Sequence, residues 1–69
     1  MTGSVLVVNG AERPVPQPAT VGALLIDLGL RPGTVVVELN GTALAASEAA
    51  GAGLAAGDRV EIVRAVPGG

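Results

Sequence analysis

Short runs of aliphatic and β-branched residues alternate along the chain with breaks that contain Gly, Pro or Asn. The first run, Val5 to Val8, is followed by Asn9-Gly10, a strong hairpin signal because both turn residues accept a positive φ at low cost. The returning strand is predicted over Glu12 to Val15. Pro14 and Pro16 have no N–H to donate to a neighbouring strand, so this strand is expected at a sheet edge.

The next segment has the period of a helix. Its apolar residues recur at helical spacing and form one stripe, made of Val21, Leu24, Leu25 and Leu28. Thr20 precedes the stripe and is expected to be the N-cap. Gly29 follows at the position of a left-handed C-cap, and Pro32 prevents continuation. Gly22 costs about 1 kcal/mol of helix propensity relative to Ala, so we predict a short helix that depends on packing.

The second half of the chain repeats the hairpin pattern. Val35 to Leu39 is another β-branched run that ends at Asn40-Gly41, and Thr42 to Leu44 is predicted to return from this turn. The segment from Ala45 to Ala56 is rich in Ala and Gly, which indicates a loop with one helical turn. Arg59 to Val66 is predicted to be the last strand.

Charged residues assign the two faces of the predicted sheet. Glu38 and Glu61 should face solvent, and alternation along a strand then points the following residues inward: Val35, Val37, Leu39, Val60 and Ile62. One helix covers only one face, which leaves Val36 and Val63, together with Val7, on the uncovered face. Scattered exposed valines are normal on protein surfaces, and a flat partner-docking patch is the alternative interpretation.

The order of these elements is strand, strand, helix, strand, short strand, strand. A hairpin crossed by one helix, with later strands added to the same sheet, predicts a β-grasp fold, the ubiquitin-like α+β arrangement. We expect a mixed sheet of four to five strands with one main helix on one face. The domain is predicted over residues 1–66, with residues 67–69 as a flexible Pro-Gly-Gly tail.

Composition excludes several kinds of chemistry. The 69 residues include no Cys, His, Lys or aromatic residue. A Cys–His pair, a Ser-His-Asp triad, a Schiff-base lysine and a soft metal site are therefore impossible on this chain. At this size an enclosed pocket for ATP or a metal is not expected either, so we predict no bound cofactor. The core must consist of aliphatic packing alone.

Charge and hydropathy limit the partners. A formal net charge of −2 with four basic residues gives no electrostatic footprint for nucleic acid. The apolar runs are too short to span a membrane. The residues from Met1 to Ser4 carry no positive charge ahead of an apolar segment, so a cytoplasmic location is expected. Arg59 and Arg64 flank the last strand, where they either meet acidic groups on a partner or keep the surface soluble.

The chain ends in Pro67-Gly68-Gly69, directly after the last predicted strand. Pro67 stops strand pairing, and the two glycines carry no side chain that would block a narrow channel. A C-terminal carboxylate is a poor electrophile until its oxygen becomes a leaving group, which adenylation by ATP achieves. Such a tail therefore suits chemistry inside the active site of another protein.

These segments together resemble the ThiS family, the sulfur carrier proteins of thiamin biosynthesis, over nearly the whole chain. The matching parts are the Val-Asn-Gly hairpin at Asn9, Thr20 to Leu30, Val37 to Gly41, Gly57 to Val63, and Gly68-Gly69. The Gly-Asp-x-Val-x-Ile stretch shortly before the terminal Gly-Gly is the most specific of them. One departure is Ala49, where the family often has an aromatic residue, and it affects local packing and possible contact with one partner.

The resemblance implies a cycle in which this chain is a substrate and carrier, not a catalyst. A ThiF-like adenylating enzyme would use ATP to convert the carboxylate of Gly69 to an acyl-adenylate, with Pro67 and Gly68 inside the enzyme's active site. A persulfide sulfur donor would then leave a thiocarboxylate on Gly69. A ThiG-like thiazole synthase would take that sulfur for the thiazole ring of thiamin.

Three other functions remain open at this point. The same sulfur chemistry serves other products, such as molybdopterin or an amino acid, with a different acceptor enzyme. A β-grasp binding or regulatory module without acyl chemistry would not need a free Gly-Gly end. A protein conjugator related to ubiquitin would need one, and the sequence distinguishes this possibility least well.

Overall fold

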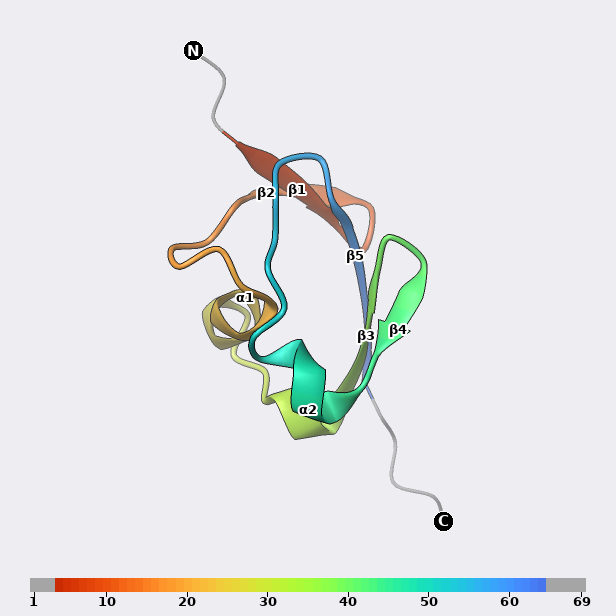
Figure 1. The fold of residues 1–69 in the computed structure, drawn as a ribbon. Helices are drawn as coiled ribbons and strands as arrows, with labels where there is room; N and C mark the ends of the chain where they lie inside the picture. Colours follow the sequence, from red (N-terminus) through yellow and green to blue (C-terminus); the bar gives the residue numbers. More distant parts are fainter. Residues whose placement is uncertain (1–3, 65–69) are drawn as a thin grey trace.

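A mixed five-stranded sheet with its helices on one face forms the framework of residues 4–64, the part of the chain that the computed structural model describes (Figure 1). The elements in chain order are β1 (Val5–Val8), β2 (Ala11–Pro14), α1 (Val21–Asp27), the 3-10 turn η1 (Pro32–Thr34), β3 (Val35–Leu39), β4 (Thr42–Leu44), α2 (Ala46–Ala49) and β5 (Arg59–Arg64). The predicted β-grasp fold is confirmed. Residues 65–66 of the last predicted strand, and the boundary to the tail at residues 67–69, lie outside the described residues.

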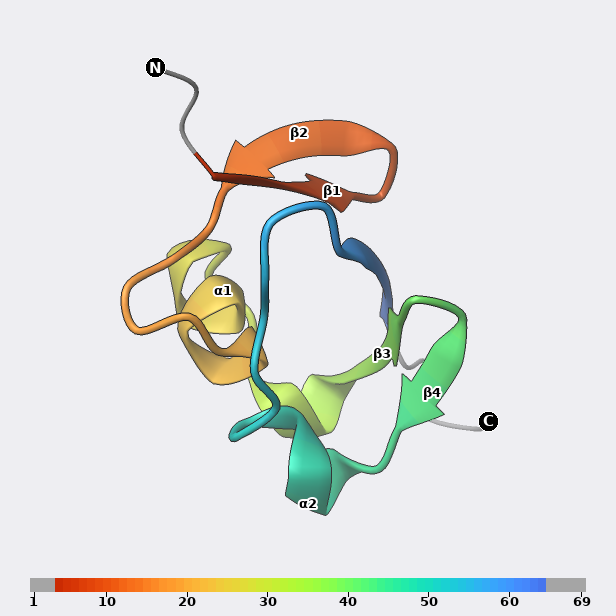
Figure 2. The same cartoon turned by 45° about the horizontal axis from the view of Figure 1, so that its top comes forward.

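Strand β5 occupies the middle of the sheet, whose order is β2-β1-β5-β3-β4. It pairs in parallel with β1 and antiparallel with β3. Each of these neighbours continues into its own hairpin, so the two hairpins lie on either side of β5 (Figure 2). The last described strand is thereby enclosed by strands that all precede it in the chain.

Both Asn-Gly turns have the predicted conformation. Asn9 and Gly10 have φ values of 48° and 84°, and Asn40 and Gly41 have values of 52° and 86°. Strand β2 lies at the sheet edge as expected but begins at Ala11, one residue before its predicted start. The physical reason is the two-residue turn, which pairs Ala11 directly with Val8 and leaves no free residue between turn and strand.

Helix α1 begins and ends where the sequence predicts. The Ala23 backbone N–H donates to the Thr20 side-chain oxygen over 3.1 Å, which caps the N-terminus. Gly29 has a φ of 73° and follows the last turn. The predicted apolar stripe is confirmed: Val21, Leu24 and Leu25 are buried, and Leu28 is half-buried against the core.

Close packing requires a glycine at residue 22, which helix propensity alone does not reveal. Its backbone N–H donates to the carbonyl oxygen of Ala50 over 3.2 Å. A Cβ at residue 22 would lie 2.6 Å from that oxygen, so a side chain would push the two segments apart. Ala49, the residue before this contact, is 2% exposed. Small residues thus let the loop after β4 approach α1 closely, and the departure at Ala49 belongs to this packing.

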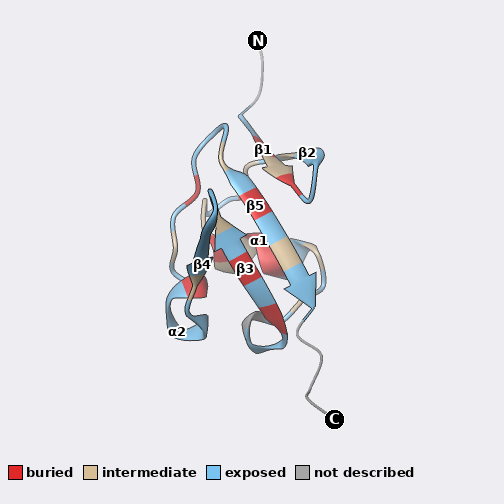
Figure 3. Cartoon of the chain, turned by 90° about the vertical axis from the view of Figure 1, so that its right-hand side faces the viewer, coloured by how far each residue is buried: buried red, intermediate tan, exposed pale blue. Residues whose placement is uncertain are grey.

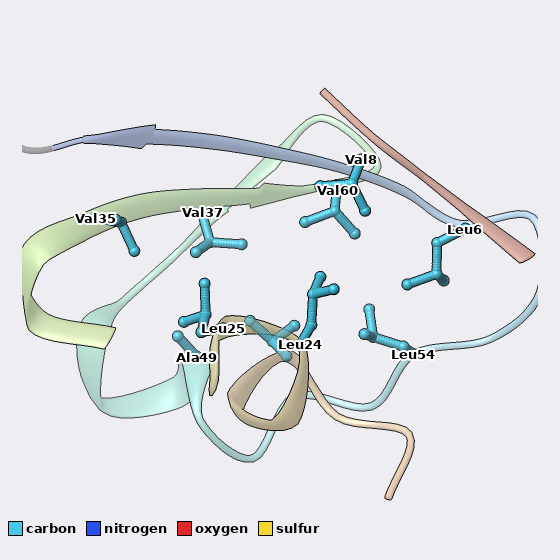
Figure 4. Close-up of a cluster of buried hydrophobic side chains, with 10 residues drawn as sticks. Leu6, Val8, Leu24, Leu25, Val35, Val37, Ala49, Leu54 and Val60 are labelled. Carbon is cyan, nitrogen blue, oxygen red and sulfur yellow. The ribbon is translucent and has the colours of Figure 1, made fainter. Parts of the chain in front are cut away.

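The core is an aliphatic cluster between the sheet and α1 (Figure 4). Its buried members are Leu6, Val8, Val21, Leu24, Leu25, Val35, Val37, Ala49, Leu54 and Val60. Burial alternates along β3 and β5 (Figure 3), and the predicted faces are confirmed. Val60 is 0% exposed, whereas Val36 and Val63 are 45% and 62% exposed. Ile62 and Leu39 point inward but are half-buried.

Two substitutions on β5 test this assignment of faces. Val60→Asp should unfold the domain, because it places an unpaired charge in a core with no polar partner and costs several kcal/mol of a small total stability. Val63→Asp should leave the melting temperature within a few degrees of wild type, because its side chain faces solvent. Circular dichroism melts of both variants decide the matter, and unfolding by Val63→Asp would show that the faces are reversed.

Candidate functional site

The residues predicted to carry the chemistry, Pro67, Gly68 and Gly69, lie outside the described part of the chain. What the structure describes is the strand that leads to them, β5, which ends at Arg64. Five residues follow Arg64 to the end of the chain. The position and direction of β5 therefore determine where the tail starts, and the site is built from the contacts that hold this strand.

One edge of β5 is held by β3 along nearly its whole length. The antiparallel pairing extends from Leu39 opposite Val60 to Val35 opposite Arg64. On the other edge, β1 pairs with β5 only at Arg59 and Val60. β1 then turns away into its hairpin, which leaves the outer half of this edge of β5 without a strand beside it.

The side chain of Asn9 continues the pairing where β1 ends. Its Nδ2 donates to the Ile62 carbonyl over 3.1 Å, and the Ile62 N–H donates to its Oδ1 over 2.7 Å. The Asn9 backbone N–H also donates to the Val60 carbonyl over 2.9 Å. A carboxamide has one donor side and one acceptor side, so it reproduces the hydrogen bonds of a strand residue. Asn9 thus extends the paired part of β5 to Ile62, two residues before Arg64.

A second asparagine holds the start of the strand in a similar way. The Arg59 N–H donates to Asn40 Oδ1 over 2.9 Å, and Asn40 Nδ2 donates to Asp58 Oδ1 over 3.1 Å. Asp58 also accepts from the Ala55 N–H over 2.8 Å through its other oxygen. Sequence reasoning assigned Asn9 and Asn40 to their turns alone. The sequence signal for this second role is Asn rather than Asp at both turns, because only a carboxamide side chain both donates and accepts hydrogen bonds.

The predicted docking residues lie on the sheet face opposite α1, called the outer face below. Val36 and Val63 are directly opposite each other across β3 and β5. Val7 shares the face but is half-buried and lies beside Arg59, four residues from Val63 along β5, or about 13 Å at the rise of a strand. The exposed apolar patch therefore consists of Val36 and Val63, with Val7 at a distance.

Two acidic residues adjoin this patch. Glu38 and Glu61 are directly opposite each other in the register. Each lies two residues from Val36 or Val63 along its strand, on the same face. Both side chains are exposed. Like charges directly opposite in an antiparallel pair are destabilising. The outer face therefore presents an apolar pair beside a doubly acidic pair, a combination suited to a partner surface with an apolar group next to a cation.

Within residues 4–64, no group of three or more acidic, His or Cys residues is close enough to hold a metal ion. Across the same range, neither helix has the length and apolar character that crossing a bilayer requires.

Comparison with known proteins relates most of the chain to one family. A family model with the description ThiS family matches residues 6–69, a range that includes Gly68 and Gly69. Among solved structures, the chain is similar to the crystal structure of the thiamine biosynthesis protein ThiS from Geobacter metallireducens. The sequence identity is 33% and the TM-score 0.74, with 94% of this chain and 99% of that chain covered. No curated protein matches the chain.

The Asn9 contacts predict a local effect on the end of β5. Asn9→Gly keeps the positive φ accessible and removes both side-chain hydrogen bonds to Ile62. At roughly 0.5–1.5 kcal/mol per bond, it should lower stability by about 1–3 kcal/mol and raise the backbone mobility of Val63 and Arg64. Asn40→Gly is the matched control, since its lost bonds lie at the start of the strand. NMR relaxation of both amides measures the effect, and equal mobility in the two variants would contradict the assignment.

Proposed function

Because this chain belongs to the ThiS family, we propose that it is a sulfur carrier protein of thiamin biosynthesis, on which partner enzymes act. The observation that carries the proposal is the family match across residues 6–69, which includes the terminal Gly68-Gly69. The similar Geobacter protein is named a thiamine biosynthesis protein and has nearly the same length as the matched region. The β-grasp fold, with its last strand leading into the tail, supports the same function.

The chemistry takes place on the carboxylate of Gly69. A ThiF-like enzyme binds ATP, and the carboxylate oxygen attacks the α-phosphorus and displaces pyrophosphate to form an acyl-adenylate. A persulfide sulfur then attacks the acyl carbon and AMP leaves. A thiol reduces the resulting acyl disulfide, its sulfur–sulfur bond breaks, and a thiocarboxylate remains on Gly69. A ThiG-like thiazole synthase transfers this sulfur to its substrate, and an oxygen atom from that substrate or from water replaces it on the acyl carbon and restores the carboxylate.

The composition of the chain protects these intermediates. An acyl-adenylate reacts with amines, and the chain has no Lys side chain to attack the Gly69 of a second copy. A thiocarboxylate forms disulfides with thiols, and the chain has no Cys. The glycines at 68 and 69 carry no side chain, so the tail fits a narrow active-site channel. The carrier supplies a narrow C-terminal end and a chain without Lys or Cys side chains, while the partner supplies the catalytic groups and ATP.

The described structure supports this role through the rigidity of the strand before the tail. Five extended residues span at most about 18 Å, so the partner's active site must lie within that distance of Arg64. The hydrogen bonds from Asn9 and β3 hold β5 up to this point. Placement of the carboxylate matters because a displacement of about 1 Å can cost on the order of 100-fold in rate.

We propose that the adenylating enzyme docks on the outer face. Val36 and Val63 are next in register to the pair of Val35 and Arg64, so this patch lies beside the start of the tail. A partner that binds the tail therefore lies close to this patch. Contact with the patch removes two exposed valines from water, and a cation on the partner would offset the repulsion between Glu38 and Glu61. Val7, half-buried at the far end of the face, would lie at the edge of such an interface.

The tail provides the direct test of sulfur carriage. The wild-type protein, incubated with ATP, a ThiF-like enzyme and a persulfide donor, should gain the mass difference between one sulfur and one oxygen, localised to Gly69. Deletion of Gly69, or one Ala added after it, should abolish this gain because the carboxylate then misses the α-phosphate. The melting temperature should stay unchanged in both variants.

Two outcomes contradict the proposal. One is sulfur gain by the variant with an added Ala at the wild-type rate. The other is a wild-type protein that gains no sulfur with any adenylating enzyme, which would favour a β-grasp binding module without acyl chemistry. Transfer of the sulfur to an acceptor other than thiazole synthase would keep the carrier chemistry and change its pathway.

The outer face is tested by a substitution that leaves the fold intact. Val63→Asp should raise the Kd for the adenylating enzyme by roughly tenfold or more, because it buries a charge in the interface where the wild type places an apolar side chain. Ile26→Asp is the matched control, since Ile26 is 75% exposed on α1, on the other side of the molecule. Calorimetric titration without ATP gives both values, and similar binding by the two variants would remove the outer face from the interface.

A further inference from the structure

The sheet face that α1 covers, called the inner face below, is left open at one end. α1 has seven residues and ends at Asp27, so it does not extend over the whole sheet. A pocket of about 370 Å³ remains at that end. Its apolar lining includes Leu28 and Leu30, which follow α1, and Ile62 of β5. The pocket thus lies beside the end of β5, the last described residues before the tail.

Two arginines line this pocket, and both occupy inner-face positions. Arg13 of β2 is opposite Leu6 in the register, and Leu6 is 0% exposed in the core. Arg64 of β5 is opposite Val35, which is 9% exposed. Residues directly opposite each other in adjacent strands share a face. The two charges therefore stand where the alternation of the sheet otherwise places core residues.

The pocket has a one-sided charge. The whole chain has four basic side chains and a net charge of −2, yet two of the four line this pocket and its described lining contains no acidic residue. Arg13 is half-buried, whereas Arg64 is exposed. A partly desolvated cation beside an apolar surface is costly unless it is paired. The complementary ligand has an apolar group for the floor and a carboxylate for the guanidinium groups.

Inward-pointing charges also have a simpler use. On an edge strand they prevent pairing with the edge of another molecule, and β2 is an edge strand. β1 pairs with β5 only at Arg59 and Val60, so Arg64 also stands beside an open part of a strand edge, and edge protection applies to it as well. Edge protection does not require the two arginines to line one apolar pocket whose described lining has no acidic residue. This shared pocket points to recognition.

We propose that this pocket receives a segment of the adenylating enzyme that carries an apolar side chain next to an Asp or Glu. This proposal rests on the carrier function proposed above. The enzyme that activates Gly69 must place its active site within about 18 Å of Arg64, so its surface passes the mouth of the pocket. The pocket and the outer face then hold the base of the tail from two sides.

Charge-reversal variants test the contact. Arg13→Glu and Arg64→Glu should each raise the KM of the adenylating enzyme for this protein about tenfold, because acidic groups then face each other, while kcat at saturation stays near wild type. Arg31→Glu changes the net charge equally, lies outside the pocket lining, and should leave KM unchanged. Arg13→Gln, which keeps most of the side-chain length, should raise KM less than Arg13→Glu does.

The control outcomes separate this proposal from the carrier function. Equal KM values for Arg64→Glu, Arg31→Glu and wild type overturn the pocket proposal and leave sulfur carriage intact. A fall in solubility of Arg13→Glu without any change in KM assigns Arg13 to edge protection and overturns it as well. A wild-type protein that gains no sulfur overturns both proposals together.

Crosslinking identifies the occupant without relying on turnover. The chain has no Cys, so Ala11→Cys places a single thiol in the exposed part of the pocket lining. A photo-crosslinker on it should capture, in the absence of ATP, a segment of the adenylating enzyme that contains an acidic and an apolar residue. Ala56→Cys, exposed in the turn before β5, is the control. Equal capture from both positions, or capture of a basic segment, overturns the proposal.

Discussion

The hydrogen bonding of β5 on both edges is the constraint on which the rest of this structure depends. Val60, the second residue of the strand, is fully buried, which fixes β5 against the core. β3 pairs with it along one edge, and on the other edge the Asn9 side chain takes over where β1 turns away. The tail that follows Arg64 therefore starts from a strand that is held on both edges as far as Ile62 and on one edge to Arg64, and both proposed partner contacts lie beside that starting point.

Small size and an aliphatic composition set the manner of packing. Without aromatic residues or disulfides, the core relies on close approach of its elements. Gly22 allows α1 to meet the carbonyl of Ala50, and the buried Ala49 keeps α2 near the same helix. The cost of a small domain is incomplete cover of its sheet. Here the short α1 leaves the pocket with Arg13 and Arg64, and no helix among residues 4–64 covers the outer face.

Much of the site was predictable because its signals are local or alternate with a fixed period. Parity along β3 and β5 correctly separated Val36 and Val63 from Val35, Val37 and Val60. The grouping of Val7 with the two exposed valines was less informative, because parity assigns a face and not a distance along it. For Arg59 and Arg64 the sequence left two roles open. The register separates them, with Arg59 beside Val7 on the outer face and Arg64 beside Val35 on the inner one.

The sequence by itself determined the elements, both hairpin turns, the cap of α1, the two faces of the sheet and the Gly-Gly ending, since each depends on neighbours a few residues apart. Only the tertiary structure decided that Asn9 bonds to Ile62, 53 residues away, and that Arg13 and Arg64 line the same pocket. Both arrangements arise from the parallel pairing of β1 with β5. Pairing of distant strands depends on how the whole core closes, and local sequence patterns carry no record of it.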